Sequence, residues 1–213
     1  MLRVDQPDDL ISFRHEAMAT DFFAYLGGHE QSYLKQAAYE AFQIIDDIEG
    51  KLSLYQESSD VSRVNLAKKG ESVPVSHEFI ECIQLAAQAS EATSGRFNAF
   101  MGKSALAAKG QTLTHFSAEP TPAQSEQPSI QVDAKNRAVQ KLTAGSLLDF
   151  GGIGKGYALD KARETLDEWE VETGLLSASG STLLFLKSPN QPWTAAIGES
   201  QIEIPDFTAL SSS

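Results

Sequence analysis

The chain has 213 residues, which is enough for one fairly large domain or two small ones with a substantial core. Its hydrophobic fraction of 41% and charged fraction of 22% are typical of an ordinary water-soluble globular protein. A net charge of −12 at pH 7 argues against a nucleic acid or an anionic membrane as partner, because phosphate groups repel such a protein.

The first half of the chain predicts a hairpin and two helices. "FRHEAMATDFFAYLGG", residues 13–28, predicts a strand pair that is closed by two glycines. Apolar residues then recur at helical spacing over about residues 31–48: Leu34, Ala38, Ala41, Ile45 and Ile48. Ser76 is suited to cap a second helix, which carries the single cysteine, Cys82, as an expected core residue and ends at residues 93–95.

The second half predicts mostly strands. Residues 109–128 are rich in Gln, Pro, Ser and Thr and predict an exposed, flexible loop. "IQVDAKNRAVQKL" predicts a hairpin that turns near Lys135, and "SLLDF" predicts a short strand. A helix follows with four residues on one face: Ala158, Ala162, Leu166 and Trp169. Three later apolar stretches predict further strands: "TGLLSASGSTLLFLK", "WTAAIG" and "QIEIPDFTAL". The mixture favours an α+β fold with largely antiparallel sheets.

The stretch "LLDFGGIGKGYALDKARETL", residues 147–166, is the strongest candidate for a functional site. It fits neither the Walker loop nor the G-x-G-x-x-G dinucleotide fingerprint. Its order of apolar run, glycine turn and helix start still offers unpaired N–H groups and a positive helix dipole to a phosphate. Lys155 could neutralise that phosphate, and Asp149 could accept a hydrogen bond from a sugar or a base. Taken alone, the stretch is equally compatible with a tight turn and a solvated lysine.

The same stretch resembles the signature of the ApbE family, the FAD:protein FMN transferases, which typically read D-[LF]-G-[GA]-I-[AG]-K-G-Y-x-x-D. Other segments agree with the family in the same order along the chain. They are "MATDFF", "LSLYQESSDVSRVNLA", "TSGRFNAFMG", "WTAAIG" and "FTALSSS". The resemblance runs from about Met18 to Ser213 and implies an ApbE-like, T-fold-like single domain over residues 1–213, incomplete at its C-terminus.

The resemblance implies a reaction and a set of site residues. Family members transfer FMN from FAD to a Thr or Ser of a target flavoprotein, release AMP and depend on Mg²⁺. The positions that match FAD contacts of the family are Met18, Tyr55, Arg96, Phe97, Asn98, Asp149 and Lys155. The backbone carbonyl of Gly152 matches a metal ligand of the family. No catalytic side chain is assigned, and the implied partner is an acceptor flavoprotein with a Thr or Ser flavinylation motif.

Three departures from the family pattern leave alternatives open. The chain stops at Ser213, before the segments in which the family carries an Asp and a Thr as magnesium ligands. Asn98 and Arg96 stand where the family has an aspartate and a small residue, and "SASGST", residues 177–182, lacks an acid. The chain is therefore a fragment of an active transferase, a homologue that binds flavin nucleotide without transferring it, or a scaffold whose site has decayed.

The expected location is the cytoplasm. The N-terminal "MLRVDQPDDLISF" contains no apolar run of the length that a signal peptide or a membrane span requires. One cysteine also fits a reducing compartment. A periplasmic protein whose leader had been removed would give the same sequence.

Overall fold

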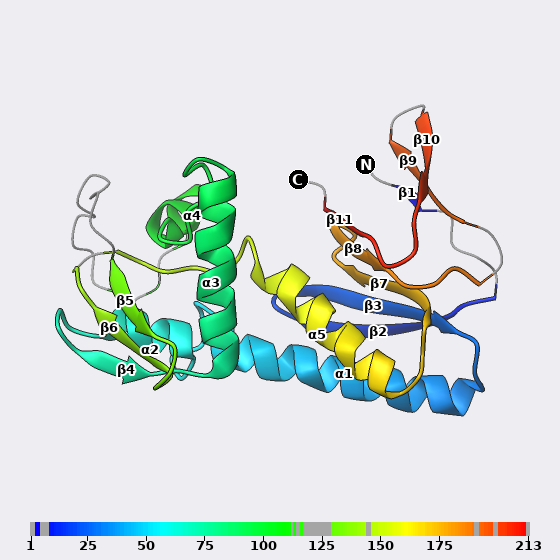
Figure 1. Cartoon of the computed structure of the whole chain (residues 1–213), viewed down its shortest axis with the longest axis horizontal. Coiled ribbons are helices and arrows are strands. Elements are labelled where there is room, and N and C mark those ends of the chain that lie inside the picture. The colour runs from blue at the N-terminus through cyan, green and yellow to red at the C-terminus, as the bar shows by residue number, and fades with distance from the viewer. Residues whose placement is uncertain are drawn as a thin grey trace. The chain divides into compact units, whose positions relative to one another are not determined.

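The computed structural model describes residues 3–4, 9–111, 113, 116, 129–143, 146–189, 192–197 and 200–211. By its internal contacts the chain divides into two compact units, shown with their elements in Figure 1. Unit 1 comprises Met1–Asp47 and Lys155–Ser213, and unit 2 comprises Ile48–Gly154. This division does not decide whether the chain is the single domain expected from its sequence, which stays a prediction.

Unit 1 is built on a five-stranded sheet in the order β11-β8-β7-β3-β2, with every neighbour antiparallel. Its strands are β2 (Ile11–Ala17), β3 (Thr20–Gly27), β7 (Thr173–Ala178), β8 (Thr182–Phe185) and β11 (Ala209–Ser211). The predicted hairpin over residues 13–28 is confirmed as β2 and β3, which Met18 and Ala19 connect. The strands predicted after the glycine cluster are confirmed as well.

A second, three-stranded sheet in the order β1-β9-β10 packs on one face of β7 and β8. Its strands are β1 (Arg3–Val4), β9 (Trp193–Ile197) and β10 (Ser200–Ile204). The shared core takes alternate residues from the strands: Leu175, Leu183, Phe185, Trp193, Ala195 and Ile204. Trp193 is 1% exposed, and its Nε1 donates a hydrogen bond to the carbonyl of Leu186. Burial of these side chains is the main force that holds the two sheets together.

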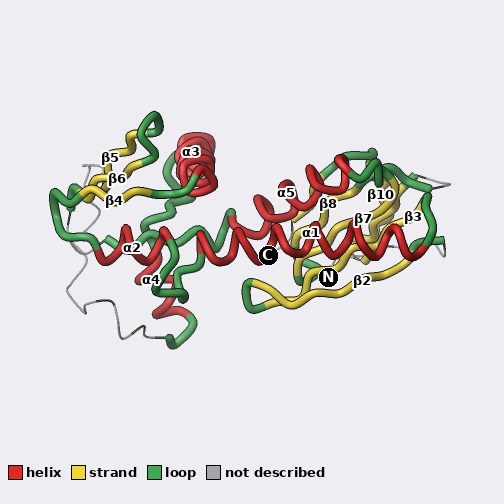
Figure 2. Tube along the Cα trace, turned by 90° about the horizontal axis from the view of Figure 1, so that it is seen from below, coloured by secondary structure: helices red, strands yellow, loops and turns green. Residues whose placement is uncertain are grey.

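Helices α1 (Gln31–Leu52) and α5 (Gly154–Glu168) cover the opposite face of the five-stranded sheet with their unit 1 portions (Figures 1 and 2). The His15 ring of β2 stacks on Phe42 of α1, and its Nε2 lies 2.7 Å from Asp46 Oδ1. Helix α1 starts where the sequence predicted and ends four residues later than predicted. In α5, Ala158, Ala162 and Leu166 are buried as predicted, and Trp169 follows the end of the helix.

Unit 2 contains a three-stranded antiparallel sheet and short helices. The sheet has the order β4 (Ser72–Pro74), β6 (Ala138–Lys141), β5 (Ile130–Asp133), which confirms the predicted hairpin near Lys135. Helix α3 (His77–Ala92) is confirmed, and Ser76 Oγ accepts a hydrogen bond from the Phe79 N–H, as a cap does. The sequence did not predict α2 (Asp60–Leu66) or α4 (Gly102–Ala108).

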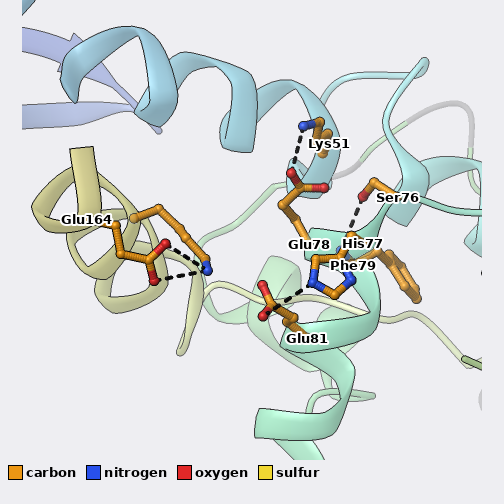
Figure 3. A network of polar contacts seen from close by, with 8 residues as sticks. Lys51, Ser76, His77, Glu78, Phe79, Glu81 and Glu164 are labelled. Carbon is orange, nitrogen blue, oxygen red and sulfur yellow. Dashed lines mark hydrogen bonds and ion pairs between the residues drawn. The ribbon is translucent and has the colours of Figure 1, made fainter. Parts of the chain in front are cut away.

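An ion pair fastens the start of α3 to the last turn of α1. Lys51 Nζ lies 3.0 Å from Glu78 Oε1, beside the Ser76 cap (Figure 3). Burial raises the pKa of Glu78, but hydrogen bonds from its own backbone N–H and from Lys51 outweigh burial, so the pKa is lowered overall. The Glu78 carboxylate therefore stays charged near the N-terminus of α3, where the helix dipole also favours it.

Two further expectations from the sequence concern a loop and membrane-spanning helices. Most of the predicted loop over residues 109–128 lies outside them, since only residues 109–111, 113 and 116 of that segment are described. Among the helices that the structure does describe, none combines the length and the apolar character needed to cross a membrane.

Lys141, at the end of β6, is a lysine in a core position. It is 2% exposed, and its Nζ donates a hydrogen bond to the carbonyl of Ser146 at 3.0 Å. Burial, followed by the charge of Lys103, lowers the pKa of Lys141 from 10.5 to about 8. The unfolded chain thus binds the lysine proton more tightly than the folded chain does.

Substitution Lys141→Met should therefore stabilise unit 2 at neutral pH. Below pH 8 the native ammonium carries its full burial penalty, and the penalty fades as pH rises from about 8 towards 10.5. We expect the free energy of unfolding, measured by urea denaturation, to rise by about 1–3 kcal/mol at pH 7 and by less at pH 10. Substitution of the exposed Lys69 by Met is the control. A stabilisation by Lys141→Met that does not shrink at high pH would contradict this account.

Candidate functional site

The segment before the glycine cluster is not the strand that the sequence predicted. Leu147 forms only an isolated bridge with Met101. Leu148 instead pairs with a side chain: its N–H donates to Asn65 Oδ1 and its carbonyl accepts from Asn65 Nδ2, both at 2.8 Å. The prediction "SLLDF" as a strand was wrong because no neighbouring strand supplies a ladder of backbone partners to these residues.

The glycine turn is closed by local hydrogen bonds around Asp149. The Asp149 N–H donates to the carbonyl of Ala99, and the Gly151 N–H donates to Asp149 Oδ1, both at 2.8 Å. The N–H groups of Ile153 and Gly154 donate to the carbonyl of Phe150, where α5 begins. The Asp149 side chain is half-buried, and no hydrogen bond to its second carboxylate oxygen is among those described. That oxygen is the natural acceptor for a ligand.

Phe97 lies directly against the glycine turn. A Cβ placed on Gly152 would come within 2.9 Å of Phe97 Cε2, so any larger residue would require the ring to move. The Phe97 N–H donates to Thr93 Oγ1, which fixes the ring's backbone to the end of α3. The structure therefore brings together three of the predicted site residues, Phe97, Asp149 and Gly152, within unit 2.

Arg96 and Asn98, on either side of Phe97, are exposed. Asn98 Oδ1 accepts a hydrogen bond from the Phe100 N–H at 2.8 Å, a turn contact that an aspartate in its place could also make. Tyr55 belongs to the same unit, on the loop between α1 and α2. It is 46% exposed, and its hydroxyl donates to Gln111 Oε1. Its ring is thus available on the surface for stacking.

Met18 and Lys155 belong to unit 1, and chain connectivity brings them to the same end of its sheet. Helix α5 leads through a short link into β7, so the helix start lies near the end of β7, which pairs with the start of β3 (Figures 1 and 2). Met18 and Ala19 both have left-handed backbone conformations, with φ of 51° and 56°. A two-residue hairpin turn with positive φ at both positions is of type I′, which matches the twist of β2 and β3 and more often carries Asn or Gly.

The segment "SASGST" meets the Met18 turn at that end of the sheet. Ser179 has a left-handed φ of 53°, and its N–H donates to the carbonyl of Asp21 at 2.8 Å. Its hydroxyl lies 2.7 Å from the hydroxyl of Ser181. The family pattern carries an acid in this segment. Here the segment has two hydroxyl groups that bind each other.

The described residues do not fit a complete magnesium site. None of them form a group of three or more His, Cys, Asp or Glu side chains that could hold a metal ion. Mg²⁺ prefers octahedral coordination by several oxygens, carboxylates among them, and the Gly152 carbonyl is one such oxygen.

Comparisons with known proteins agree on one family. The model of the ApbE family matches residues 18–213. An FAD:protein FMN transferase of Klebsiella pneumoniae (strain 342) is 26% identical over 200 residues, which cover 88% of this chain and 61% of the relative. An FAD:protein FMN transferase of Chlamydia muridarum (strain MoPn / Nigg) is 28% identical over 138 residues, which cover 61% of this chain and 42% of the relative.

Solved structures show the same fold. The apo form of the Pseudomonas stutzeri flavinyl transferase ApbE has a TM-score of 0.74 and 23% identity, and the match covers 94% of this chain and 69% of that one. The ApbE protein of Thermotoga maritima has a TM-score of 0.71 and 25% identity, with 87% and 62% covered. The α+β fold with largely antiparallel sheets is thereby confirmed. The chain spans 61% of the length of the curated Klebsiella relative.

The contact between Phe97 and Gly152 predicts the effect of one added methyl group. Gly152→Ala should lower the free energy of unfolding by about 0.5–1.5 kcal/mol, because the half-buried Phe97 ring must leave its preferred rotamer. Gly154→Ala is the matched control: its Cβ would meet nothing within 4 Å, and alanine favours the helix by up to about 1 kcal/mol. In a Phe97→Ala background the cost of Gly152→Ala should largely vanish in urea denaturation. An undiminished cost there would show that another group opposes the methyl.

Proposed function

The chain belongs to the ApbE family, and from this membership we propose that it binds FAD and takes part in the Mg²⁺-dependent transfer of FMN to a Thr or Ser of an acceptor flavoprotein. The observation that carries the proposal is the packing of Phe97 on Gly152 next to Asp149. It brings an aromatic ring and a carboxylate acceptor together at one glycine turn.

The proposed reaction transfers the FMN half of FAD to the acceptor hydroxyl by cleavage of the FAD pyrophosphate. The acceptor hydroxyl oxygen forms a bond to the phosphorus of the FMN half and loses its proton. The P–O bond to the other half breaks, and AMP leaves with the bonding electrons. Such a step depends on the positioning of the nucleophile and on the stabilisation of the charge that develops on the phosphate oxygens.

The residues of this chain would bind and orient the nucleotide. The Lys155 ammonium, in the first turn of α5, would offset phosphate charge together with the helix dipole. The Asp149 carboxylate would accept from a ribose hydroxyl or a base N–H, and the faces of Tyr55 and Phe97 would take ring systems. Met18, Arg96 and Asn98 complete the proposed FAD contacts. The Gly152 carbonyl remains the proposed metal ligand, and its partners would come from outside the groups described above.

A transfer assay tests the function. The purified 213-residue chain is incubated with FAD, Mg²⁺ and an acceptor protein that carries a D-x-x-[ST]-G-[AS]-[ST] segment. We expect release of AMP together with a covalently flavinylated, fluorescent acceptor, and loss of both when the acceptor hydroxyl residue is replaced by Ala. Tight FAD binding without either product would identify a homologue that binds FAD and does not transfer FMN. Absence of FAD binding would overturn both functions.

Lys155→Ala tests whether the glycine turn is the nucleotide site. Loss of one charge-assisted contact should weaken FAD binding by about 1–3 kcal/mol, measured by quenching of flavin fluorescence. Lys161→Ala is the matched control, because it removes the same charge from the same helix, where Lys161 pairs with Glu164. Equal FAD affinity in the wild type and in Lys155→Ala would mean that the nucleotide binds elsewhere.

A further inference from the structure

Asn65 is the one described side chain that satisfies both backbone groups of Leu148. Its Nδ2 donates to the Leu148 carbonyl and its Oδ1 accepts from the Leu148 N–H, each at 2.8 Å. Leu148 is 0% exposed, so water is a poor substitute for these bonds. Only a side-chain amide of this length offers a donor and an acceptor side by side, as a neighbouring strand would.

The residues on both sides of Leu148 are held by a different segment of the chain, residues 99–102. The Gly102 N–H donates to the carbonyl of Leu147 at 3.0 Å, and the Asp149 N–H donates to the carbonyl of Ala99 at 2.8 Å. Residues 147–149 are therefore fixed by the 99–102 segment through their outer members and by Asn65 through the middle one. Removal of Asn65 would free the backbone immediately before the Asp149 carboxylate.

Helix α2, which carries Asn65, is anchored by small polar side chains at and next to its N-terminus. Ser59 Oγ accepts from the Ser62 N–H at 3.0 Å and donates to the carbonyl of Ser53 at 2.5 Å. Ser62 Oγ donates to the carbonyl of Leu54 at 3.2 Å. These bonds join α2 to the residues on the N-terminal side of Tyr55. The same short helix thus holds the Tyr55 loop at one end and, through Asn65, the Asp149 segment at the other.

The Asp60 carboxylate ties this helix to the rest of unit 2. It pairs with Arg63 and accepts from the Ser76 N–H at 2.7 Å, just before α3. Ser59, Asp60 and Ser62 are all less than 9% exposed, so these polar groups hold fixed positions inside the unit. These polar contacts therefore hold helix α2 in place within unit 2.

We propose that Asn65 is a positioning residue for the nucleotide site: it fixes the backbone of Leu148 so that the neighbouring Asp149 carboxylate is preset for its ligand. This inference rests on the proposed FAD site, and it adds a residue that touches neither nucleotide nor metal. A preset carboxylate binds more tightly because less conformational freedom is lost on binding.

Two variants separate positioning from general stability. Asn65→Asp keeps the acceptor and removes the donor, and Asn65→Leu removes both. Val139→Ala is the control: Val139 is 1% exposed in β6, so its truncation destabilises unit 2 and removes none of the hydrogen bonds given for residues 147–149. All proteins are compared under conditions in which circular dichroism shows that they are folded.

The first measurement is amide hydrogen exchange without any nucleotide. The amides of Leu148, Asp149 and Gly151 should lose protection in both Asn65 variants and keep it in Val139→Ala, relative to amides of α3. The second measurement is FAD affinity, which should fall about tenfold or more in the Asn65 variants and stay near the wild-type value in the control.

The outcomes are distinguishable. Unchanged local protection in the Asn65 variants, or an equal loss in Val139→Ala, overturns the positioning role. Wild-type FAD affinity in the Asn65 variants also overturns it and leaves the proposed function intact. Failure of the wild-type protein itself to bind FAD overturns the proposed function, and with it the part of this inference that concerns the nucleotide.

Discussion

The double hydrogen bond between Asn65 and Leu148 is the constraint on which the rest of the candidate site depends. A buried residue outside any sheet must still satisfy its N–H and its carbonyl, and here one amide side chain does both. Because Asp149 follows directly, the position of its carboxylate is constrained by Asn65, which lies 83 positions before Leu148 in the chain. Within unit 2 the glycine turn continues from that fixed point to the carbonyl of Phe150, which accepts from the N–H groups of Ile153 and Gly154.

The glycines of the turn serve different physical purposes. Gly152 makes room for the Phe97 ring, whereas Gly154 and Gly156 have open space around them. The Gly154 N–H already binds the Phe150 carbonyl, so the N–H groups that remain for an anion belong to the following residues in the first turn of α5. In this cluster one glycine packs against a side chain, and the next two begin a helix with free space around them. A Walker loop differs, because its successive N–H groups surround a phosphate.

Periodicity predicted the elements that bury one apolar face and missed those held by polar contacts. Helices α1 and α3 and the strands of unit 1 follow from apolar spacing and from the Ser76 cap. Helix α2 was missed because its buried apolar face is limited to Val61 and Val64. The side chains of Ser59, Asp60 and Ser62 bind backbone groups instead of extending that face. The pairing of Asn65 with Leu148 could not be predicted either, because residues so far apart in the sequence come into contact only when the chain folds. The only hint in the sequence is that Asn65 lies near the end of a segment that resembles a sequence pattern of the family.

The negative net charge of the protein places one demand on nucleotide binding and another on the proposed transfer reaction. With a net charge of −12, the protein repels a pyrophosphate at a distance, so binding must come from donors at short range. Lys155 and the N–H groups at the start of α5 are donors of that kind. The proposed transfer additionally needs neutralisation of the charge that grows on the phosphorus oxygens as AMP departs, which Mg²⁺ would supply. The proposed nucleotide binding therefore rests on residues that the structure describes, whereas the proposed transfer needs metal ligands that the described carboxylates do not supply as a group.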